Sequence, residues 1–494
     1  MKNFFDRIVR FFDKPLPFIG LLIVLATSLR SLFMTKAAIW HDEGYSTAII
    51  NYPLGEIITR TINDVHPPFY YILLHIWQSI FGSSIVSLRG LSVVLGVMTI
   101  VVLYLLMRRL FSEKVAKLTG IFAAFGPFLI RYSDEVRMYA LAALLAVLAT
   151  YLLVIAISKT TKQRYWWWGG YALIIALGLY TQYFFIFIIP VHIIYTLAIH
   201  KWQIKRLLAD KGWWLGNLLA AGMFLPWLPV MLAQTSRVQQ GFWIPPVNLG
   251  SIPNTISNFM TYDNTIAILF GYCLLVAIVI VPLIFALKSK KYLESTLLLV
   301  GWLILPIIFV ALLSLGRPVY IDRYFTYSAP AFYALIALTI SSIRTKKWKW
   351  IQPTLIVLTL ATFTIGLVNV AAAATHQMNR VVNVVNREFR PGDTIVSAEL
   401  YTFFDFSYYN QTGAEVKLLS SKPFGKYGEM SLLYDKPHLR VASLSDINSE
   451  RVWLVGKTGE HSYFSEEIPA NWRLISQTEA SDSAARLYEI TPAL

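Results

Sequence analysis

The sequence has a single cysteine, Cys273, among its 494 residues, and this cysteine lies inside an apolar stretch. One cysteine excludes an internal disulfide framework. A lone cysteine among apolar residues usually acts as a small buried hydrophobe. We therefore expect Cys273 to be buried, and we expect no redox chemistry.

Charged residues are scarce as well. They make up 14% of the chain, whereas apolar residues make up 56%, and the charge-poor stretches are long enough to cross a bilayer. This pattern excludes a soluble core and indicates a polytopic α-helical membrane protein. No small-residue cleavage site follows the first apolar segment, so we expect that segment to be a retained helix and not a removed signal peptide.

Several motifs of common enzyme classes are missing. The chain has no Walker loop, no dinucleotide-binding glycine fingerprint, no zinc-ligand spacing and no nucleophile elbow. It also has no repeat of about 20 to 50 residues and no low-complexity run. Cytoplasmic nucleotide hydrolysis as an energy source is therefore not supported, and an activated donor outside the cytoplasm is the natural substitute.

The net charge of +15 is unevenly distributed. Residues 1–374 contain 31 Lys/Arg and 13 Asp/Glu, a balance of +18, whereas the remaining residues contain 12 and 15, a balance of −3. Of the basic residues, 22 cluster in six short groups, which the positive-inside rule assigns to cytoplasmic loops. The excess charge belongs to membrane topology, so we expect no nucleic-acid partner. The groups lie at residues 2–14, 108–117, 159–164, 201–211, 288–291 and 344–349.

These basic groups fix the direction of the membrane spans. The apolar segment 67–81 has 15 residues, whereas a span needs ~20, and counting it as a span would place the later basic groups on the wrong side. Its Pro-Pro start and its aromatic residues favour an interfacial helix in the first outer loop. About eleven spans then alternate, at residues 16–33, 91–107, 115–130, 140–157, 166–180, 184–199, 213–232, 266–287, 296–314, 325–343 and 351–373.

The tail, residues 375–494, changes character. Short apolar segments separated by Gly, Pro, Asn and Ser turns predict strands at 394–398, 416–419, 451–455 and 485–490, with helices at 378–389 and 399–409. We expect a membrane domain over residues 1–374 and a small extracytoplasmic α/β domain over residues 375–494. The tail carries no catalytic motif of its own, so it is interpreted as a cap that packs on the membrane domain and shapes access for an acceptor.

Two pairs of adjacent carboxylates fall on the outer side of the membrane. Asp42 and Glu43 follow the first span, and residues 131–137, after the third span, contain two carboxylates between two arginines. A solvated turn is the usual explanation for one such pair. Ionisable groups at a membrane edge are costly and tend to be functional, so two pairs on one face favour an extracytoplasmic active site.

The chemistry of sugar transfer would use these residue types. A carboxylate such as Asp42 can take or orient the proton of an acceptor hydroxyl or amine. A departing phosphate needs cations to stabilise its developing charge, and Arg137 and Arg323 can fork onto phosphate oxygens. Asp134 and Glu135 are the carboxylates of the second pair.

Two other features have competing interpretations, and a third has one. His66, which precedes Pro67, is either a hydrogen-bonded structural group or a contact to phosphate or metal. Gln182, at an outer hairpin, is similarly divided between a structural and a functional role. The three tryptophans at residues 166–168 are interpreted as an interfacial aromatic belt.

These motifs, taken in order, resemble those of the GT-C glycosyltransferases of the protein-mannosyltransferase and aminoarabinose-transferase type. The similarity extends over residues 15–345, and the tail resembles the extracytoplasmic domain of many bacterial members. It rests on Asp-Glu at 42–43, His-Pro-Pro-Phe-Tyr-Tyr at 66–71, Ser-Asp-Glu-Val-Arg-Met-Tyr at 133–139, Thr-Gln-Tyr at 181–183, Phe-Trp-Ile-Pro-Pro at 242–246 and Arg-Tyr at 323–324.

The resemblance implies a GT-C-like fold and an inverting transfer from a polyprenyl-phosphate-linked sugar to an outer acceptor. It implies Asp42, with Glu43, as the catalytic carboxylates. Some relatives bind a divalent cation and others need none, so Mg²⁺ or Mn²⁺ could be held by Asp42 and Glu135. The residues implied to bind substrate are His66, Tyr70, Asp134, Glu135, Arg137, Tyr139, Gln182, Tyr183, Arg323 and Tyr324.

This chain departs from its relatives at two positions. Relatives often have Gln where this chain has Asp134, and His where it has Gln182, which leaves a role for Gln182 as a base or ligand open. The expected acceptor is a glycolipid, a polysaccharide or a protein, and the expected location is the inner, cytoplasmic membrane with the N-terminus in the cytoplasm. The alternatives are a lipid or sugar transporter, which would favour charges at mid-span in two similar halves, and a non-catalytic subunit that binds lipid headgroups.

Overall fold

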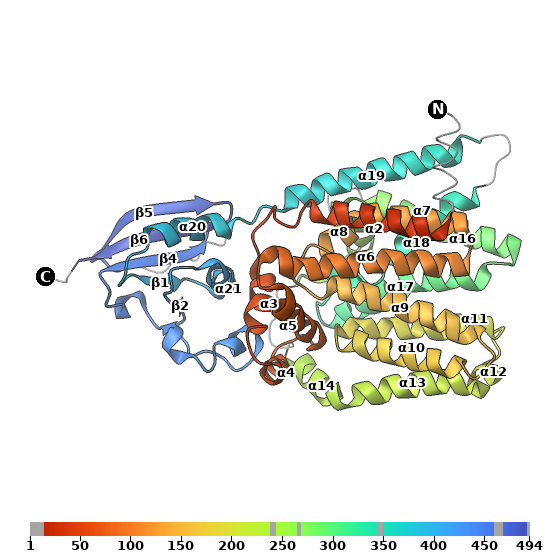
Figure 1. The fold of residues 1–494 in the computed structure, drawn as a ribbon, viewed down its shortest axis with the longest axis horizontal. Coiled ribbons are helices and arrows are strands. Elements are labelled where there is room, and N and C mark those ends of the chain that lie inside the picture. The colour runs from red at the N-terminus through yellow and green to blue at the C-terminus, as the bar shows by residue number, and fades with distance from the viewer. Residues whose placement is uncertain (1–13, 238–243, 264–267, 344–348, 459–467, 492–494) are drawn as a thin grey trace. The chain divides into compact units, whose positions relative to one another are not determined.

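The computed structural model describes residues 14–237, 244–263, 268–343, 349–458 and 468–491. The chain is mostly helical, with a sheet near its C-terminus (Figure 1). It forms two compact units. The first, the helical unit, comprises residues 1–33 and 89–371, and the second, the mixed unit, comprises residues 34–88 and 372–494. Phe242 and Trp243 of one motif, and the basic residues at 2–10 and 344–347, lie outside the described residues.

Within the described residues, each expected span lies on helical segments, and residues 266–267 of the span at 266–287 lie outside the described residues. Six of the described helical stretches are long and apolar enough to cross a membrane, namely Ile85–Leu110, Tyr139–Ser158, Lys211–Arg237, Ile268–Ser289, Leu293–Gly316 and Ile351–Glu388. The helical unit contains α2 Pro15–Ser31, α6 Ile85–Leu110, α7 Glu113–Phe125, α8 Pro127–Tyr132, α9 Tyr139–Ser158, α10 Arg164–Leu179, η1 Tyr183–Phe187, α11 Ile188–Ile199, α12 Ile204–Ala209, α13 Lys211–Phe224, η2 Leu225–Trp227, α14 Leu228–Arg237, α15 Ser251–Thr261, α16 Ile268–Ser289, α17 Leu293–Gly316, η4 Asp322–Phe325, α18 Ala329–Ser342 and α19 Ile351–Ala373. The first residues of α6, 85–88, and the last of α19, 372–373, fall in the mixed unit.

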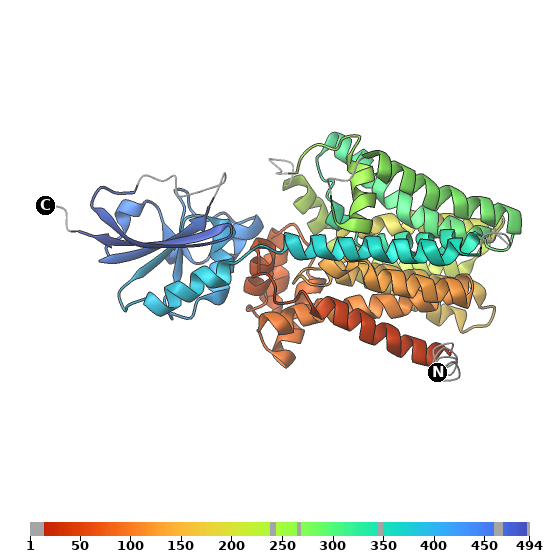
Figure 2. The ribbon, with the colours of Figure 1, turned by 90° about the horizontal axis from the view of Figure 1, so that it is seen from above.

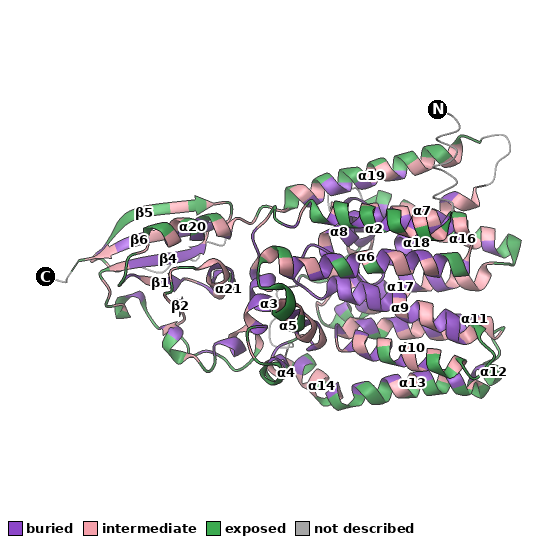
Figure 3. Cartoon of the chain, in the orientation of Figure 1, coloured by how far each residue is buried: buried purple, intermediate pink, exposed green. Residues whose placement is uncertain are grey.

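The long helices of this unit run side by side (Figures 1 and 2). Helix α10 packs between α9 and α13, and α18 packs on α7. Helix α9 is buried along most of its length, whereas α16 and α19 expose much of their apolar surface (Figure 3). Exposed apolar faces on long helices suit contact with lipid, because no polar solvent meets them in a bilayer.

Cys273 differs from the expectation for a cysteine in an apolar stretch. It lies in α16 and is exposed, not buried. An apolar sequence predicts which residues leave water, but in a membrane helix either the protein interior or the lipid can receive them. The sequence alone does not show whether an apolar residue such as Cys273 faces the protein interior or the lipid.

A break between α7 and α8 leads the chain into the segment with the second carboxylate pair. Gly126 ends α7 and Pro127 begins α8, where a proline needs no helical hydrogen bond. A Cβ atom at Gly126 would lie 2.4 Å from the Tyr333 ring, so only glycine allows this approach. The Tyr333 hydroxyl donates to the Phe259 carbonyl at 2.7 Å, which holds the ring in place.

The mixed unit is built on a six-stranded sheet with strand order β3-β2-β1-β4-β6-β5. Strands β1 to β4 are parallel, and β6 is antiparallel to β4 and β5. Helices α20 and α21 pack against the sheet (Figure 2). The bounds are α3 His41–Ile49, α4 Leu54–Asn63, α5 Phe69–Phe81, α20 Met378–Glu388, β1 Thr394–Ser397, α21 Leu400–Tyr409, β2 Val416–Leu419, η5 Gly428–Leu432, η6 Pro437–Leu439, β3 Arg440–Val441, η7 Leu444–Asp446, β4 Arg451–Lys457, β5 Trp472–Ala480 and β6 Ser483–Ile490.

The four expected strands and both expected helices of the tail are confirmed as β1, β2, β4, β6, α20 and α21. Strands β3 and β5 were missed. Strand β3 has two residues, too few for a pattern, and β5 is a mostly exposed edge strand with many polar residues. Strands are recognised by apolar alternation, which an exposed edge does not need.

The segment expected to form the first outer loop belongs to the mixed unit and not to the helical unit. Residues 34–88, which contain α3, α4 and α5, group with the C-terminal domain. The expected boundary at 374/375 treated the loop as part of the membrane domain. That boundary stays a prediction, but the C-terminal domain has more packing partners than the tail alone provides.

Helix α3 approaches α21 closely because residue 44 is glycine. A Cβ atom at Gly44 would lie 2.4 Å from the Asp405 Oδ1 atom and 3.0 Å from both the Asp405 backbone nitrogen and the Phe404 Cβ atom. We expect Gly44→Ala to lower the free energy of unfolding of this unit by about 1 to 3 kcal/mol, because the buried Asp405 carboxylate and the adjoining backbone of α21 would have to move. Thermal unfolding of the purified protein measures the effect.

Gly55→Ala is the matched control for this prediction. Gly55 also lies in a helix of the first loop, and a Cβ atom added there would meet no atom outside its own helix within 4 Å. Alanine there should be neutral or stabilising by up to ~1 kcal/mol. Equal unfolding temperatures for the two variants would show that the contact between α3 and α21 does not need glycine.

Candidate active site

Asp42 lies in the first turn of α3 and is half-buried. Its neighbours His41, Glu43 and Gly44 are all buried. The Trp40 backbone N–H donates to Glu43 Oε2 at 3.4 Å, so Glu43 helps to cap the helix. The two adjacent carboxylates therefore differ in position, and Asp42 is the more accessible of the two.

His41 brings a residue of the C-terminal domain to this turn. Its Nε2 atom lies 2.6 Å from Glu429 Oε2, and its ring packs against Tyr401 with centroids 4.5 Å apart. Burial lowers the pKa of His41, but the hydrogen bond to Glu429 and the charges of Glu429, Asp405 and Asp42 outweigh it and raise the pKa. Ligand atoms of His41, Asp42 and Glu429 lie within 4.8 Å of one another.

Glu429 was not identified in the sequence. It lies 388 positions from His41, in a short 3₁₀ helix without a motif. Sequence spacing cannot reveal such a partner.

The other predicted residues of the mixed unit lie at the start of α5. His66 is half-buried just before this helix, and Tyr70 is 1% exposed. The Tyr70 ring meets Tyr71 in an edge contact at 5.9 Å, and Tyr71 meets Tyr45 of α3 at 6.0 Å. Tyr70 is therefore part of an aromatic cluster that connects α5 with the helix carrying Asp42.

In the helical unit, the segment with the second carboxylate pair is buried. Glu135 is 1% exposed, and its Oε1 atom forms an ion pair with Arg131 Nη2 at 2.5 Å. The Ser92 hydroxyl donates to the Glu135 carbonyl oxygen at 2.6 Å, which fixes the backbone of this segment. Asp134, Arg137 and Tyr139 are buried as well. Buried charges of both signs are expensive, so this segment meets the physical criterion for a functional site.

Arg323 and Tyr324 lie in η4, between α17 and α18. Burial raises the pKa of the Tyr132 hydroxyl, the charge of Glu135 adds to this rise, and the charge of Arg323 opposes it. Arg323 therefore shares surroundings with the second carboxylate pair within the helical unit. The Tyr324 ring lies 5.0 Å from that of Phe184, next to the Thr-Gln-Tyr motif.

The neighbouring carboxylate, Asp322, has a structural role in the loop. Its Oδ1 atom accepts a hydrogen bond from the Thr255 hydroxyl at 2.5 Å, and its Oδ2 atom accepts one from the Asn258 amide. Burial raises the pKa of Asp322, although these hydrogen bonds oppose the rise. Asp322 thus ties the loop that carries Arg323 to helix α15.

Gln182 and Tyr183 differ in the hydrogen bonds that their side chains form. The Tyr183 hydroxyl donates to the Gln234 side-chain oxygen and accepts from Trp227 Nε1 at 2.8 Å, which indicates a structural role. The Gln182 amide is buried, and among the described residues it has no hydrogen-bond partner. A buried unsatisfied amide costs about 1 to 3 kcal/mol, so Gln182 is the stronger candidate for substrate contact.

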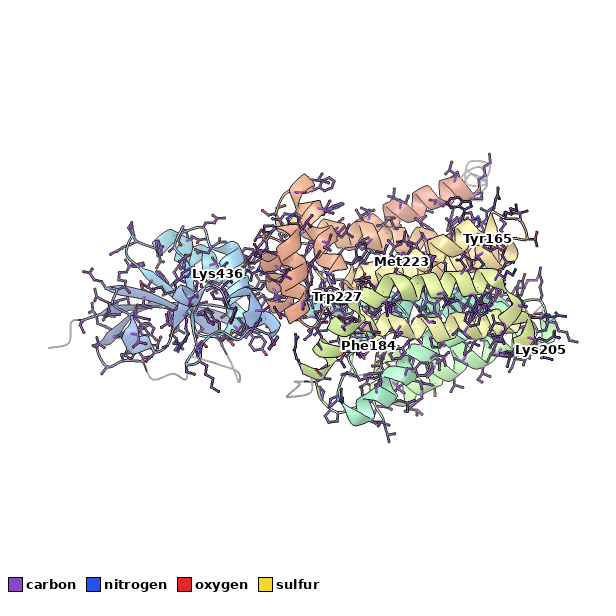
Figure 4. The ribbon with its side chains drawn as sticks, turned by 90° about the horizontal axis from the view of Figure 1, so that it is seen from below. Tyr165, Phe184, Lys205, Met223, Trp227 and Lys436 are labelled. Carbon is purple, nitrogen blue, oxygen red and sulfur yellow. The ribbon has the colours of Figure 1, made fainter. Side chains whose placement is uncertain are left out.

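The ends of the helical unit differ in composition. Figure 4 shows Phe184 and Trp227 at one end of these helices and Tyr165 and Lys205 at the other. The first end contains the Thr-Gln-Tyr motif. The second contains two of the basic groups assigned to the cytoplasm, at residues 159–164 and 201–211.

The arrangement brings the predicted residues together in two sets. The mixed unit contains Asp42, Glu43, His66 and Tyr70, and the helical unit contains Asp134, Glu135, Arg137, Tyr139, Gln182, Tyr183, Arg323 and Tyr324. Asp42 and Glu135 belong to different units, so their pairing in one cleft or around one cation stays a prediction.

A second histidine, the half-buried His376, links three parts of the mixed unit. Its Nε2 atom lies 3.2 Å from Asp405 Oδ2 in α21, its Nδ1 atom lies 2.9 Å from Asp482 Oδ1 before β6, and its carbonyl accepts from the Ala38 N–H at 2.9 Å. Burial lowers the pKa of His376, but the hydrogen bonds and charges of the two aspartates raise it to about 9. The positive charge of Lys457 also lowers the pKa of both aspartates.

These contacts predict a loss of stability in alkali. Because the folded pKa of His376 exceeds the ~6.5 of a free histidine, its contribution is complete below that value and is lost as the pH rises through about 9. Between pH ~7 and ~9.5, we expect the unfolding midpoint of the wild-type protein to fall roughly 2 to 4 °C further than that of His376→Gln. His438→Gln, at an exposed histidine, should keep the wild-type slope, and identical slopes for all three proteins would contradict the assignment.

Residues 65–229 match the family model of dolichyl-phosphate-mannose-protein mannosyltransferases. This match includes the predicted residues from His66 to Tyr183 and excludes Asp42, Glu43, Arg323 and Tyr324. A comparison with the sequences of curated proteins gives no match.

Solved structures match over nearly the whole chain. ArnT from Cupriavidus metallidurans in the apo state gives a TM-score of 0.69 at 12% identity, with 95% of this chain and 98% of that chain covered. The same protein bound to undecaprenyl phosphate gives 0.66 at 12% identity and the same coverage. The oligosaccharyltransferase from Archaeoglobus fulgidus in complex with Zn and sulfate gives 0.54 at 13% identity, with 89% of this chain and 67% of that chain covered. The chain thus has the fold of GT-C glycosyltransferases, and it is a multi-pass membrane protein.

Proposed function

We propose that the protein is an integral-membrane glycosyltransferase that moves a sugar from a polyprenyl-phosphate-linked donor to an extracytoplasmic acceptor, with inversion at the anomeric carbon. The observation that carries this proposal is the fold match over 95% of this chain to an enzyme captured with undecaprenyl phosphate. The match of residues 65–229 to a family that uses a dolichyl-phosphate sugar supports the same donor class. The donor sugar is a hexose or a pentose, and the acceptor is a glycolipid, a polysaccharide or a protein.

In the proposed reaction, Asp42 acts as the general base. Its carboxylate accepts the proton of the acceptor hydroxyl or amine while the acceptor atom forms a bond to the anomeric carbon. The bond between that carbon and the phosphate oxygen breaks, and the electron pair leaves with the polyprenyl phosphate. One displacement inverts the configuration at the anomeric carbon. The half-burial of Asp42, beside a buried Glu43 that caps the helix, supports Asp42 as the base.

The leaving phosphate gains negative charge during this step. Arg323 and Arg137 are proposed to stabilise it, since a guanidinium can donate two parallel hydrogen bonds to phosphate oxygens. Glu135 is proposed to hold Arg131 and the surrounding backbone in place, as its ion pair with that arginine indicates. Substrate contacts are proposed for His66, Tyr70, Asp134, Tyr139, Gln182 and Tyr324.

A divalent cation is compatible with one donor set. His41, Asp42 and Glu429 offer an imidazole and two carboxylates within 4.8 Å of one another, a mixture that suits Zn²⁺ or Mn²⁺ better than Mg²⁺. These residues would hold such an ion, and it would supply Lewis-acid stabilisation of phosphate oxygens. The proton transfer to Asp42 and the role of the arginines are derived without it.

We also propose the topology. About eleven helices cross the inner membrane, α5 lies at the outer interface, the N-terminus is cytoplasmic and the C-terminal domain is extracytoplasmic. The basic groups at one end of the helical unit support this direction. In a Cys273→Ser background, a membrane-impermeant thiol reagent added outside should label Asn448→Cys and not Lys162→Cys. Labelling of Lys162→Cys and not of Asn448→Cys would show that the protein has the opposite orientation in the membrane.

The activity itself is tested in reconstituted vesicles. Purified protein is mixed with polyprenyl-phosphate sugars labelled in the sugar, one hexose and one pentose at a time, and with a membrane extract as the source of acceptors. The proposal predicts that the label leaves the polyprenyl lipid and joins an acceptor. Label that crosses the bilayer on an intact donor would instead indicate a transporter, and donor that neither moves nor reacts would indicate a binding subunit.

A further inference from the structure

A segment of the C-terminal domain, residues 428–436, holds the helices of the first outer loop within the mixed unit. The Arg60 side chain of α4 pairs with Asp435 at 2.6 Å and donates to the Ser431 carbonyl at 3.2 Å. The Tyr52 hydroxyl donates to the Leu432 carbonyl at 3.1 Å. The loop that carries Asp42 is therefore tied to residues far away in the sequence.

Within this segment, Glu429 is directed to the turn that contains Asp42. Gly428 has φ +66, a backbone conformation that glycine adopts at little cost, and it allows a tight turn just before Glu429. Glu429 Oε2 then meets His41 Nε2 at 2.6 Å. His41 is buried, whereas Glu429 keeps about a third of its side chain exposed.

The C-terminal domain constrains the same turn from a second side. The backbone of α3 at Gly44 lies against Asp405 of α21, and the His41 ring packs on Tyr401 of α21. The residues on both sides of Asp42 are thus fixed by the C-terminal domain, and the Asp42 carboxylate lies within 4.8 Å of ligand atoms of His41 and Glu429.

We propose that Glu429 is a positioning residue for sugar transfer, which orients Asp42 through its hydrogen bond to His41. This inference rests on the proposed function and goes beyond it, because it assigns the C-terminal domain a part in the chemistry as well as in acceptor access. A displacement of about 1 Å of a catalytic group can lower a rate by roughly 10²-fold, and residues that hold reacting groups commonly matter by about 10- to 100-fold.

The test compares Glu429→Ala with Glu429→Gln in the full-length protein. Alanine removes the hydrogen-bond acceptor, so we expect kcat for transfer to fall by about 10- to 100-fold, with the KM for the polyprenyl-phosphate donor within about twofold of wild type. Glutamine keeps an acceptor oxygen at the same reach, so it should restore kcat to within about fivefold. Asp435→Asn is the matched control, since it weakens another ion pair of the same segment without touching α3, and its kcat should stay within about twofold.

A double variant identifies the route of the effect. If Glu429 acts through His41, then Glu429→Ala combined with His41→Ala should lower kcat no further than either single change. Independent effects that multiply would overturn the inference. An unchanged kcat in Glu429→Ala, or a change confined to the KM of the acceptor, would also overturn it, the latter in favour of a domain that only shapes acceptor access.

Hydrogen exchange tests the geometry without an activity assay. In Glu429→Ala, and not in Asp435→Asn, the backbone amides of the first turn of α3 should exchange about tenfold faster than in wild type. Unchanged exchange would overturn the positioning role. If wild-type protein transfers no sugar while the exchange result holds, the proposed function fails and the structural coupling stands, so the two failures can be told apart.

Discussion

Asp42→Asn is expected to lower kcat for sugar transfer by about 10²- to 10⁴-fold, the range that a general base contributes. Asparagine has nearly the shape of aspartate but cannot accept the acceptor's proton, so α3 and its contacts with the C-terminal domain should be kept. The affinity for the polyprenyl-phosphate donor should stay within about twofold of wild type, because the proposed phosphate contacts come from other residues. Steady-state kinetics and a donor-binding titration measure the two effects.

Glu56→Gln is the matched control for this change. Glu56 is a carboxylate of the same loop, exposed in α4 and paired with Arg60 at 3.2 Å, so its loss should leave transfer within about twofold. Substantial turnover by a well-folded Asp42→Asn protein would remove Asp42 from the chemistry. A loss of donor binding in step with kcat would assign Asp42 to binding instead.

The second large effect is expected at the proposed phosphate site. Arg323→Ala should raise the dissociation constant for polyprenyl phosphate by about 10- to 100-fold, since a hydrogen bond to a charged group contributes about 1.5 to 3 kcal/mol. Arg323→Lys keeps the charge but not the fork of donors, and should recover part of the affinity. Titration of the protein in nanodiscs with polyprenyl phosphate, without any sugar, isolates this contact from the acceptor.

Arg317→Ala provides the comparison, because Arg317 lies just after α17 in the same loop and has no assigned role in binding. Its affinity for polyprenyl phosphate should remain near wild type. If both variants bind equally well, or if Arg323→Ala impairs only the acceptor, the phosphate is held elsewhere and Arg137 becomes the principal candidate.

Much of the fold follows from the sequence by two simple patterns. Long apolar stretches bounded by basic groups predicted helices at all eleven positions, and the turn-bounded apolar segments of the tail predicted β1, β2, β4 and β6. Both patterns work because whole apolar segments leave water, either for the protein interior or for the lipid. The patterns do not say where a removed segment goes, which is why Cys273 was expected inside the protein and lies on an exposed face of α16.

The site was partly predictable for a similar physical reason. Carboxylates and arginines at a membrane edge are expensive enough to identify residues 131–139, and in the structure Asp134, Glu135 and Arg137 are buried. The sequence and the resemblance favoured Asp42 over Glu43 as the base, but the physical difference between the two carboxylates depends on which side chain caps α3. It could not identify Glu429, whose approach to His41 depends on tertiary packing of the loop against the C-terminal domain.

The central claim, transfer from a polyprenyl-phosphate sugar, is tested most directly by following the donor phosphate in ³¹P NMR with purified protein in lipid vesicles and an acceptor extract. Transfer predicts that the phosphodiester of the donor becomes the phosphomonoester of polyprenyl phosphate, that the sugar appears on the acceptor with inverted configuration, and that Asp42→Asn does neither. A phosphodiester that persists with every donor sugar and acceptor extract, while the wild-type protein remains folded, would contradict the account.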